Sequence, residues 1–302
     1  MGVRLGLDVG GTKVNIGLLE KDGKLLYREK VPIPKGVAAR ELMQALAIRV
    51  GELLEGRGLT QADVVAIGIG VPGTTDGHVV LHAPNLHWKN EPCADYFEAT
   101  FGAKPLLAQD TRAAAWGEYR LGAGRNKRVL VCVTLGTGIG CGIIINGRIF
   151  EGGLGTAGEV GHIPVVPGGR ACNCGRQGCM ETYASGSGIL TTAKEYPQLG
   201  QRVNSALDVF DLALKNDPFA RKVISSAVGF CGQALCAVVN AFSPDALIFS
   251  GGMSAQADLY IKPLLTHLRE NAYALAVGEK LLMDVSSLGE DAPMIGAAML
   301  GA

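Results

Sequence analysis

The sequence predicts an α/β protein built from two related domains, and two observations carry this prediction. The first is that short apolar runs with glycine-rich turns alternate with longer segments whose apolar residues recur at helical spacing. The second is that one pattern occurs twice: residues 3–31 and 128–150 each contain a strand, a glycine-rich turn with threonine, a second strand, a polar turn and a third strand. This repetition indicates an internal duplication.

The expected elements follow in chain order from the same signals. Short apolar runs bounded by turn residues predict strands at 3–7, 14–20, 25–33, 64–70, 105–109, 128–134, 141–147, 148–150 and 246–250. Helical apolar spacing predicts helices at 37–57, 110–122 and 218–241, another after Gly251-Gly252, and a last one from about Glu290. The repeat places the domain boundary near residue 115. We therefore expect a small α/β lobe at 1–115, completed by the C-terminal helix at about 290–302, and a larger lobe at 116–289.

Composition excludes several classes of protein. The chain has 302 residues, of which 48% are hydrophobic and 19% charged, with 28 basic and 28 acidic residues. These values are typical of a soluble globular protein, and zero net charge is not the footprint of a nucleic-acid binder. We see no apolar run long enough to cross a bilayer and no signal peptide, so we expect a cytoplasmic protein without nucleic-acid or membrane partners.

Each glycine-rich turn carries groups that suit a phosphate. Glycines let successive backbone N–H groups converge on an anion, and threonine adds a hydroxyl donor. The first turn also has Asp8, which is suited to hold Mg²⁺ through water, and Lys13, which adds positive charge. A single turn of this kind is usually only structural, but two in a repeated setting favour nucleotide binding. The candidate residues are Asp8, Gly10, Gly11, Thr12, Lys13, Gly136, Thr137 and Gly138.

Asp110 stands where an expected strand ends and an expected helix begins. One interpretation is a helix N-cap, which aspartate suits well. The other is a catalytic base that accepts the proton of an attacking hydroxyl. Phosphoryl transfer needs positioning and charge neutralisation more than covalent catalysis, so one carboxylate with Mg²⁺ is adequate.

A glycine-rich loop concentrates potential metal ligands. His162, Cys172, Cys174 and Cys179 lie within eighteen residues, a set that matches a Cys₃His zinc site. Accidental clustering and a redox role are the alternatives. With four protein ligands the site is closed, which is typical of structural zinc. We expect it to hold Glu159, His162 and Glu181 around a polar ligand, with one His162 nitrogen on zinc and the other toward that ligand.

Together these motifs resemble the ROK family of bacterial sugar kinases, most of all the glucokinases within it, over nearly the whole length. The matching stretches are residues 8–13, 68–73, 83–86, 109–110, 135–140 and 155–162, the cysteine loop through Glu181, and Ser250-Gly251-Gly252. The resemblance implies an ATP-dependent transfer of phosphate to the 6-hydroxyl of a hexose. It also implies a two-lobed actin-like/hexokinase (ribonuclease H-like) ATPase fold, with ATP and sugar in the cleft between the lobes.

The same resemblance assigns roles to residues. Asp110 would be the base, and the sugar would be held by Gly73, Asn85, Gln109, Glu159, His162 and Glu181. ATP would be held by the two glycine-rich turns, with Gly251 and Gly252 beside the adenosine. The implied cofactors are ATP, Mg²⁺ and structural Zn²⁺, and the family favours homodimers or homotetramers.

Two departures and several alternatives stay open. Gln109 replaces an asparagine that the family uses to bind the sugar, and Cys141 replaces a glycine. Glucose is the expected sugar, whereas N-acylmannosamine, mannose, allose and fructose are alternatives within the family. A sugar-responsive regulator is a remote alternative, since a DNA-binding domain would have to precede Asp8. An actin-like filament or chaperone ATPase would have no use for the zinc loop.

Overall fold

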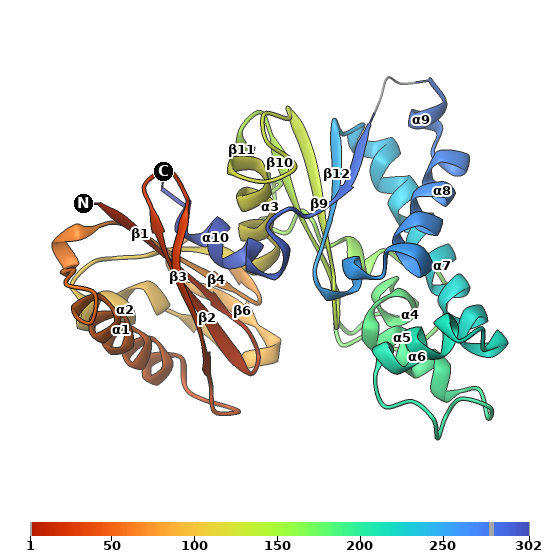
Figure 1. Cartoon of the computed structure of the whole chain (residues 1–302), viewed down its shortest axis with the longest axis horizontal. Helices are drawn as coiled ribbons and strands as arrows, with labels where there is room; N and C mark the ends of the chain where they lie inside the picture. The colour runs from red at the N-terminus through yellow and green to blue at the C-terminus, as the bar shows by residue number, and fades with distance from the viewer. Residues whose placement is uncertain (1, 278–280, 302) are drawn as a thin grey trace. The chain divides into compact units, whose positions relative to one another are not determined.

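The computed structural model describes residues 2–277 and 281–301, and the chain forms two compact units (Figure 1). Unit 1 contains residues 1–126, 148–157 and 290–302, and unit 2 contains residues 127–147 and 158–289. The first division falls at residue 126 rather than near 115. The reason is that helix α3 (Asp110–Arg120) packs along α10 (Ala292–Ala298) and so lies wholly within unit 1.

Unit 1 is a five-stranded sheet with helices on both faces. The strand order is β3-β2-β1-β4-β8, in which β1, β4 and β8 run parallel and β2 and β3 are antiparallel to their neighbours. The strands are β1 (Val3–Val9), β2 (Lys13–Glu20), β3 (Leu25–Pro32), β4 (Val64–Val71) and β8 (Leu106–Gln109). One face packs its apolar side chains against α1 (Ala39–Glu55) and α2 (Cys93–Phe101).

The other face of this sheet has a row of three glycines. Gly17, Gly6 and Gly68 are paired across β2, β1 and β4. A Cβ atom on Gly6 would lie 2.1 Å from the carbonyl oxygen of Met294, and one on Gly68 would lie 1.9 Å from that of Ala297. The missing side chains therefore let α10 lie directly on the strands, which explains why the C-terminal helix belongs to this unit.

A small sheet follows β4 in the chain. It consists of β5 (Thr74–Thr75), β6 (Val80–Ala83) and β7 (Trp88–Glu91), with a 3₁₀ turn at Pro84–Leu86 between the last two. Its strands have only two to four residues, which is too short for a periodic pattern to predict them.

Unit 2 repeats the arrangement of unit 1. Its strands β9 (Val129–Leu135), β10 (Ile139–Ile145), β12 (Ala246–Ser250) and β13 (Leu282–Val285) have the order β10-β9-β12-β13. As with β2-β1-β4-β8, the first pair is antiparallel and the others are parallel. The strand β11 (Arg148–Ile149) follows β10 in the chain. The expected repeat is thus visible in the sheet topology.

The helices of unit 2 surround one long buried helix, α7 (Pro218–Phe242) (Figure 1). They are α4 (Glu181–Ala184), α5 (Gly186–Lys194), α6 (Ala206–Leu214), α8 (Lys262–Asn271) and α9 (Tyr273–Val277). Contrary to the sequence-based expectation, α7 is long and apolar enough to cross a membrane, with a mean hydropathy of 1.6. However, 61% of that window is buried inside the protein, as in a core helix.

Candidate active site

The carboxyl ends of β1, β4 and β8 bring several predicted residues to one edge of the unit 1 sheet. Asp8 on β1 is paired with Gly70 on β4, and Val71 is paired with Gln109 on β8. Asp110 follows at once as the first residue of α3. A Cβ atom on Gly70 would be 3.6 Å from the Asp110 Cα atom. Parallel strands end at the same edge, so Asp8 and Asp110 flank the end of β4.

Asp8 is held by a residue that the sequence reasoning did not identify. The Asn15 amide donates a hydrogen bond of 2.8 Å to the Asp8 carboxylate, across the β1–β2 pair. Burial raises the pKa of Asp8, although the Asn15 hydrogen bond and the charge of Lys13 lower it in part. Asn15 Oδ1 is buried without a hydrogen-bond partner in the described part of the chain. Asn15 is a partly buried position of β2, and nothing in the sequence pattern distinguishes it from other strand residues.

Asp110 lies in the first turn of α3 but is not its N-cap, which is Gln109. This corrects the interpretation of Asp110 as the cap itself. The Thr111 N–H donates a hydrogen bond of 2.7 Å to Asp110 Oδ1. A carboxylate at this position is stabilised by the positive end of the helix dipole. Asp110 is therefore oriented by its own helix and remains partly exposed.

Gly73 and Asn85 lie in the connections of the small sheet that follows β4, Gly73 just before β5 and Asn85 between β6 and β7. Gly73 has φ +154°, and a Cβ atom there would be 2.3 Å from the His82 carbonyl oxygen and 2.8 Å from the Ala83 Cα atom. The loop after β4 therefore packs directly on β6. Asn85 comes two residues after Ala83, in the turn at Pro84–Leu86, and its side chain is exposed.

In unit 2 the second glycine-rich turn lies at the corresponding edge. The turn is closed by a hydrogen bond of 3.0 Å from the Gly136 N–H to the Gly138 carbonyl oxygen. Gly251 has φ +85°, and a Cβ atom there would be 2.4 Å from the Leu135 carbonyl oxygen. Residues 136–138 and 251–252 therefore meet at the ends of β9 and β12.

The three predicted sugar-binding residues of unit 2 pack around β10. Glu181 Oε2 accepts a hydrogen bond of 2.7 Å from the Ile139 N–H, directly after the glycine-rich turn. A Cβ atom on Gly161 would be 2.2 Å from the Ile139 carbonyl oxygen, so the segment that holds Glu159 and His162 also lies against β10. His162 Nε2 is 3.8 Å from Glu159 Oε2.

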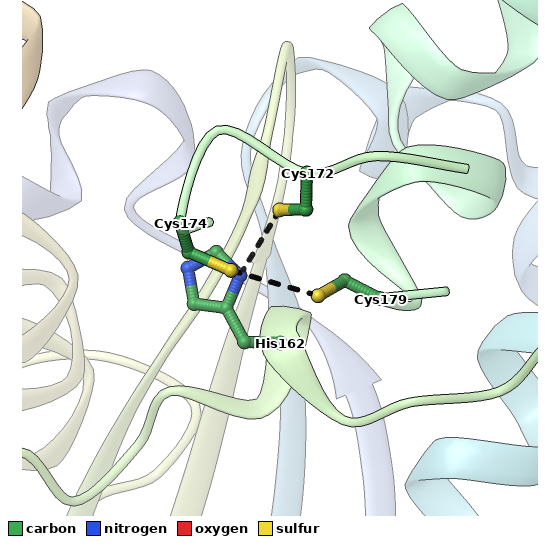
Figure 2. A group of neighbouring side chains, drawn as sticks. All are labelled: His162, Cys172, Cys174 and Cys179. Carbon is green, nitrogen blue, oxygen red and sulfur yellow. Dashed lines mark hydrogen bonds between the residues drawn. The ribbon is translucent and has the colours of Figure 1, made fainter. Parts of the chain in front are cut away.

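His162, Cys172, Cys174 and Cys179 converge, with their ligand atoms all within 4.8 Å of one another (Figure 2). His162 Nδ1 is 3.6 Å from Cys172 Sγ, and the Sγ atoms of Cys174 and Cys179 are 3.7 Å apart. Zinc bonds of about 2.3 Å to sulfur and about 2.0 Å to nitrogen imply tetrahedral edges of about 3.8 Å and about 3.6 Å. These two separations match the edges of a tetrahedral zinc site.

The cysteine loop is a compact hairpin that leads into α4. Gly178 has φ +76°, and a Cβ atom there would be 1.8 Å from the Val166 carbonyl oxygen. Cys179 and Pro164 form an isolated antiparallel β-bridge. The Met180 N–H donates a hydrogen bond of 2.9 Å to the Ile163 carbonyl oxygen. Glu181 is two residues after Cys179, so the Cys/His cluster is connected along the chain to the Ile139 contact.

Cys141, the second departure from the family pattern, is a core residue. It lies on β10 and is buried, and this burial raises the pKa of its thiol to about 12. The thiol therefore remains protonated at neutral pH and packs as a small apolar side chain.

The chain is similar to known proteins over nearly its whole length. The ROK family description matches residues 4–302. A glucokinase of Halalkalibacterium halodurans is 34% identical, over 98% of this chain and 94% of the relative. A ROK family glucokinase of Streptomyces griseus, solved with glucose and AMPPNP, superposes with a TM-score of 0.81 at 36% identity over 98% of both chains.

A regulator is also similar in structure. A ROK family transcriptional regulator, described as a homologue of the E. coli MLC protein, has a TM-score of 0.85 at 27% identity. The match covers 98% of this chain and 76% of that protein. Because the family description spans nearly every residue and full-length relatives exceed 30% identity, this chain belongs to the ROK family and has its actin-like/hexokinase ATPase fold.

Proposed function

We propose that this protein is an ATP-dependent hexose kinase that phosphorylates the 6-hydroxyl of glucose. The observation that carries the proposal is the arrangement at one edge of the unit 1 sheet. There Asp110, at the start of α3, lies near Asp8, which precedes the glycine-rich turn at residues 10–13. The Streptomyces griseus glucokinase, which is similar over 98% of both chains, binds glucose and AMPPNP. That similarity supports the same pair of substrates here.

In this proposal Asp110 is the general base. It accepts the proton of the sugar hydroxyl while the hydroxyl oxygen forms a bond to the γ-phosphorus of ATP. The bond from that phosphorus to the bridging oxygen breaks, and ADP departs with its electron pair. No covalent enzyme intermediate is needed, because phosphoryl transfer depends on positioning and on neutralising charge.

The proposed sugar ligands are Gly73, Asn85, Gln109, Glu159, His162 and Glu181. The phosphates of ATP take the N–H groups of residues 10–13 and 136–138, and Gly251 and Gly252 flank the adenosine. Bound Mg²⁺ would neutralise phosphate charge, and the carboxylate of Asp8 is the oxygen ligand suited to hold it through water.

We assign His162, Cys172, Cys174 and Cys179 to a structural zinc ion. Four protein ligands close the coordination shell, so no position remains for substrate. The His162 Nδ1 atom faces the cysteines and Nε2 faces Glu159. Zinc would thereby fix the ring so that Nε2 and Glu159 present a polar pair to the sugar.

A sugar-responsive regulator is the second candidate, because a regulator shares this fold at 27% identity. A Xylose repressor of Bacillus subtilis is also 25% identical over 99% of this chain. A binding protein has no need of Asp110 in the role of base, so catalysis separates the two candidates. We further expect a cytoplasmic homodimer or homotetramer, which light scattering after gel filtration would measure.

The test is a coupled assay of ADP release with Mg-ATP and a panel of glucose, mannose, N-acetylmannosamine, allose and fructose. We expect glucose to be turned over best. Another preferred sugar would make Gln109 the first suspect for altered specificity. No turnover on any sugar would contradict the kinase and favour the regulator.

Asp110→Asn removes the base while keeping the shape of the side chain. We expect kcat to fall by roughly 10³-fold or more, because proton acceptance is lost at the reacting hydroxyl. The melting temperature and glucose binding, measured by calorimetry, should change little. Substantial residual turnover would remove Asp110 from this role.

A further inference from the structure

Arg112 is the most deeply buried guanidinium of the described chain, with 3% of its side chain exposed. It lies on α3, two residues after Asp110. Arginine is almost never buried to this extent without partners, because removing its charge from water is costly. The partners of Arg112 therefore indicate what its burial accomplishes.

These partners all belong to one irregular segment of unit 1, residues 151–157. Arg112 Nη2 donates hydrogen bonds to the carbonyl oxygens of Gly155, at 2.7 Å, and Ala157, at 3.1 Å. Arg112 Nη1 is 3.5 Å from Glu151 Oε1. The Glu151 side chain is 62% exposed, so solvent screens this ion pair and the two carbonyl contacts dominate.

The segment has few hydrogen bonds of its own. The described ones are from the Gly155 N–H to the Gly152 carbonyl oxygen, at 3.3 Å, and from the Ala157 N–H to the Glu151 carbonyl oxygen, at 2.9 Å. The Arg112 guanidinium thus bonds two carbonyl oxygens, of Gly155 and Ala157, that lie outside any strand or helix. The planar fork of arginine suits this task, because it holds two acceptors in a fixed geometry.

Residues 151–157, which Arg112 contacts, lie directly before a passage of the chain between the two units. The chain passes from unit 1 to unit 2 between Ala157 and Gly158, and Glu159 follows. On the unit 2 side, Gly158 has φ +97°, and a Cβ atom there would be 2.4 Å from the Cys141 carbonyl oxygen. The backbone just before Glu159 is therefore held on one side by Arg112 and on the other by close packing on β10.

Stability alone is a weak explanation for Arg112. Its Nε is buried and lacks a hydrogen-bond partner among residues 2–277 and 281–301. A buried charge with an unsatisfied donor contributes little net stability compared with an apolar side chain of similar volume.

We infer that Arg112 is a positioning residue, which ties the helix of Asp110 to the segment that leads into Glu159 and His162. The tether orders the backbone of residues 151–157, from which the chain continues directly into the segment of the proposed sugar ligands. This inference rests on the proposed kinase function, but the tether itself is testable without activity.

The variants are Arg112→Met, Arg112→Lys and the control Arg120→Met, which removes an arginine from the other end of the same helix. Arg120 lies over the Trp116 ring, 5.2 Å from its centroid. We expect Arg112→Met to raise the KM for glucose by about ten- to a hundredfold and the KM for ATP by less than about twofold. Arg112→Lys should recover part of the loss, since lysine keeps the charge without the fork. Arg120→Met should match the wild type.

Hydrogen exchange measured by mass spectrometry supplies the readout that does not depend on catalysis. Peptides from residues 151–162 should exchange several-fold faster in Arg112→Met than in Arg120→Met, because the carbonyl anchors are lost. Unchanged exchange with an unchanged KM for glucose would overturn the inference. A lower melting temperature with equal effects on both substrates would also overturn it, by making Arg112 only structural.

Two complications have defined outcomes. If Arg112→Met does not fold, Arg112→Lys carries the same comparison, and wild-type values for it would contradict the inference. If the wild type turns over no sugar, the proposed function fails, while the exchange of residues 151–162 still decides whether the tether exists.

Discussion

The two glycine-rich turns occupy equivalent places in the duplicated sheets, but their surroundings differ. Turn 1 (residues 10–13) joins β1 to β2, and turn 2 (residues 136–138) joins β9 to β10. Each is closed by one backbone hydrogen bond, from the Gly10 N–H to the Lys13 carbonyl oxygen at 2.9 Å and from the Gly136 N–H to the Gly138 carbonyl oxygen at 3.0 Å. The closing bond joins residues three apart in turn 1 and two apart in turn 2, so the two backbones differ in register.

Turn 1 is exposed and charged, and the Ile33 N–H donates a hydrogen bond of 3.0 Å to its Thr12 carbonyl oxygen. A Cβ atom on Gly11 would meet no atom within 4 Å, and residues 11–13 are exposed. Turn 2 is supported by its own unit. The Gly186 N–H donates a hydrogen bond of 2.8 Å to the Gly136 carbonyl oxygen, and Glu181 accepts one from Ile139. Both units thus have a glycine-rich turn at this place, but only turn 2 has a described hydrogen bond from the adjoining backbone to a side chain, the carboxylate of Glu181 just after the cysteine loop.

The loss of a proposed zinc ligand should have the largest effect on the support of turn 2. In Cys174→Ala we expect zinc to fall from one ion per chain to none and the KM for glucose to rise by about tenfold or more. The reason is that the loop no longer fixes His162 or Glu181. Atomic absorption and the coupled assay measure the two effects.

The matched control is Cys93→Ala, which alters a buried cysteine of unit 1. It should keep its zinc and the wild-type KM, with at most a modest loss of stability. A Cys174→Ala enzyme that is free of metal and fully active would contradict the structural role of zinc.

A methyl group added to each turn tests the support more gently. A Cβ atom on Gly138 would be 2.5 Å from Glu181 Oε2, so Gly138→Ala must displace that carboxylate. We expect the KM for glucose to rise by roughly five- to twentyfold. Gly11→Ala has free space and should leave the KM for glucose within about twofold, whatever its effect on ATP. Equal effects of the two substitutions on glucose would show that turn 2 gains nothing from Glu181.

The smallest effect concerns the charge beside turn 1. Because burial raises the pKa of Asp8, its stabilising contribution is complete below the ordinary value of 3.8 and is lost as pH rises through the raised value. Ionised Asp8 therefore destabilises the fold at neutral pH. Asp8→Asn should raise the melting temperature by roughly 1–3 °C at pH 7.5, with the gain disappearing as pH falls toward 4.

Asp208 provides a control of opposite sign for this melting experiment. Hydrogen bonds from the Asn204 and Ser205 N–H groups lower its pKa. Its contribution is present above the ordinary value and is lost as pH falls through the lowered one. Asp208→Asn should therefore lower the melting temperature at pH 7.5, and this difference should shrink in acid. A stabilising effect of Asp8→Asn that does not vary with pH would exclude ionisation as its cause.

The features that depend on local pattern or on ligand chemistry could be predicted from the sequence. Alternating strands and glycine turns identified the duplicated sheets, because strand and turn preferences are set by neighbouring residues. The three cysteines and His162 were predicted as a zinc site, since few other functions use that set of donors at that spacing. Asp110 was predicted at the start of a helix, and α3 begins there.

Which polar side chains are buried, and what they contact, could be seen only in the folded chain. Glu118 on α3 is fully buried and accepts a hydrogen bond from the Ala123 N–H at 2.8 Å. Arg112 finds its acceptors 43 and 45 residues away. Helical spacing alone did not identify either residue as buried, because their environment depends on which segments pack against α3. A buried charge must meet its partner wherever the folded chain brings one, and this is a property of the packing.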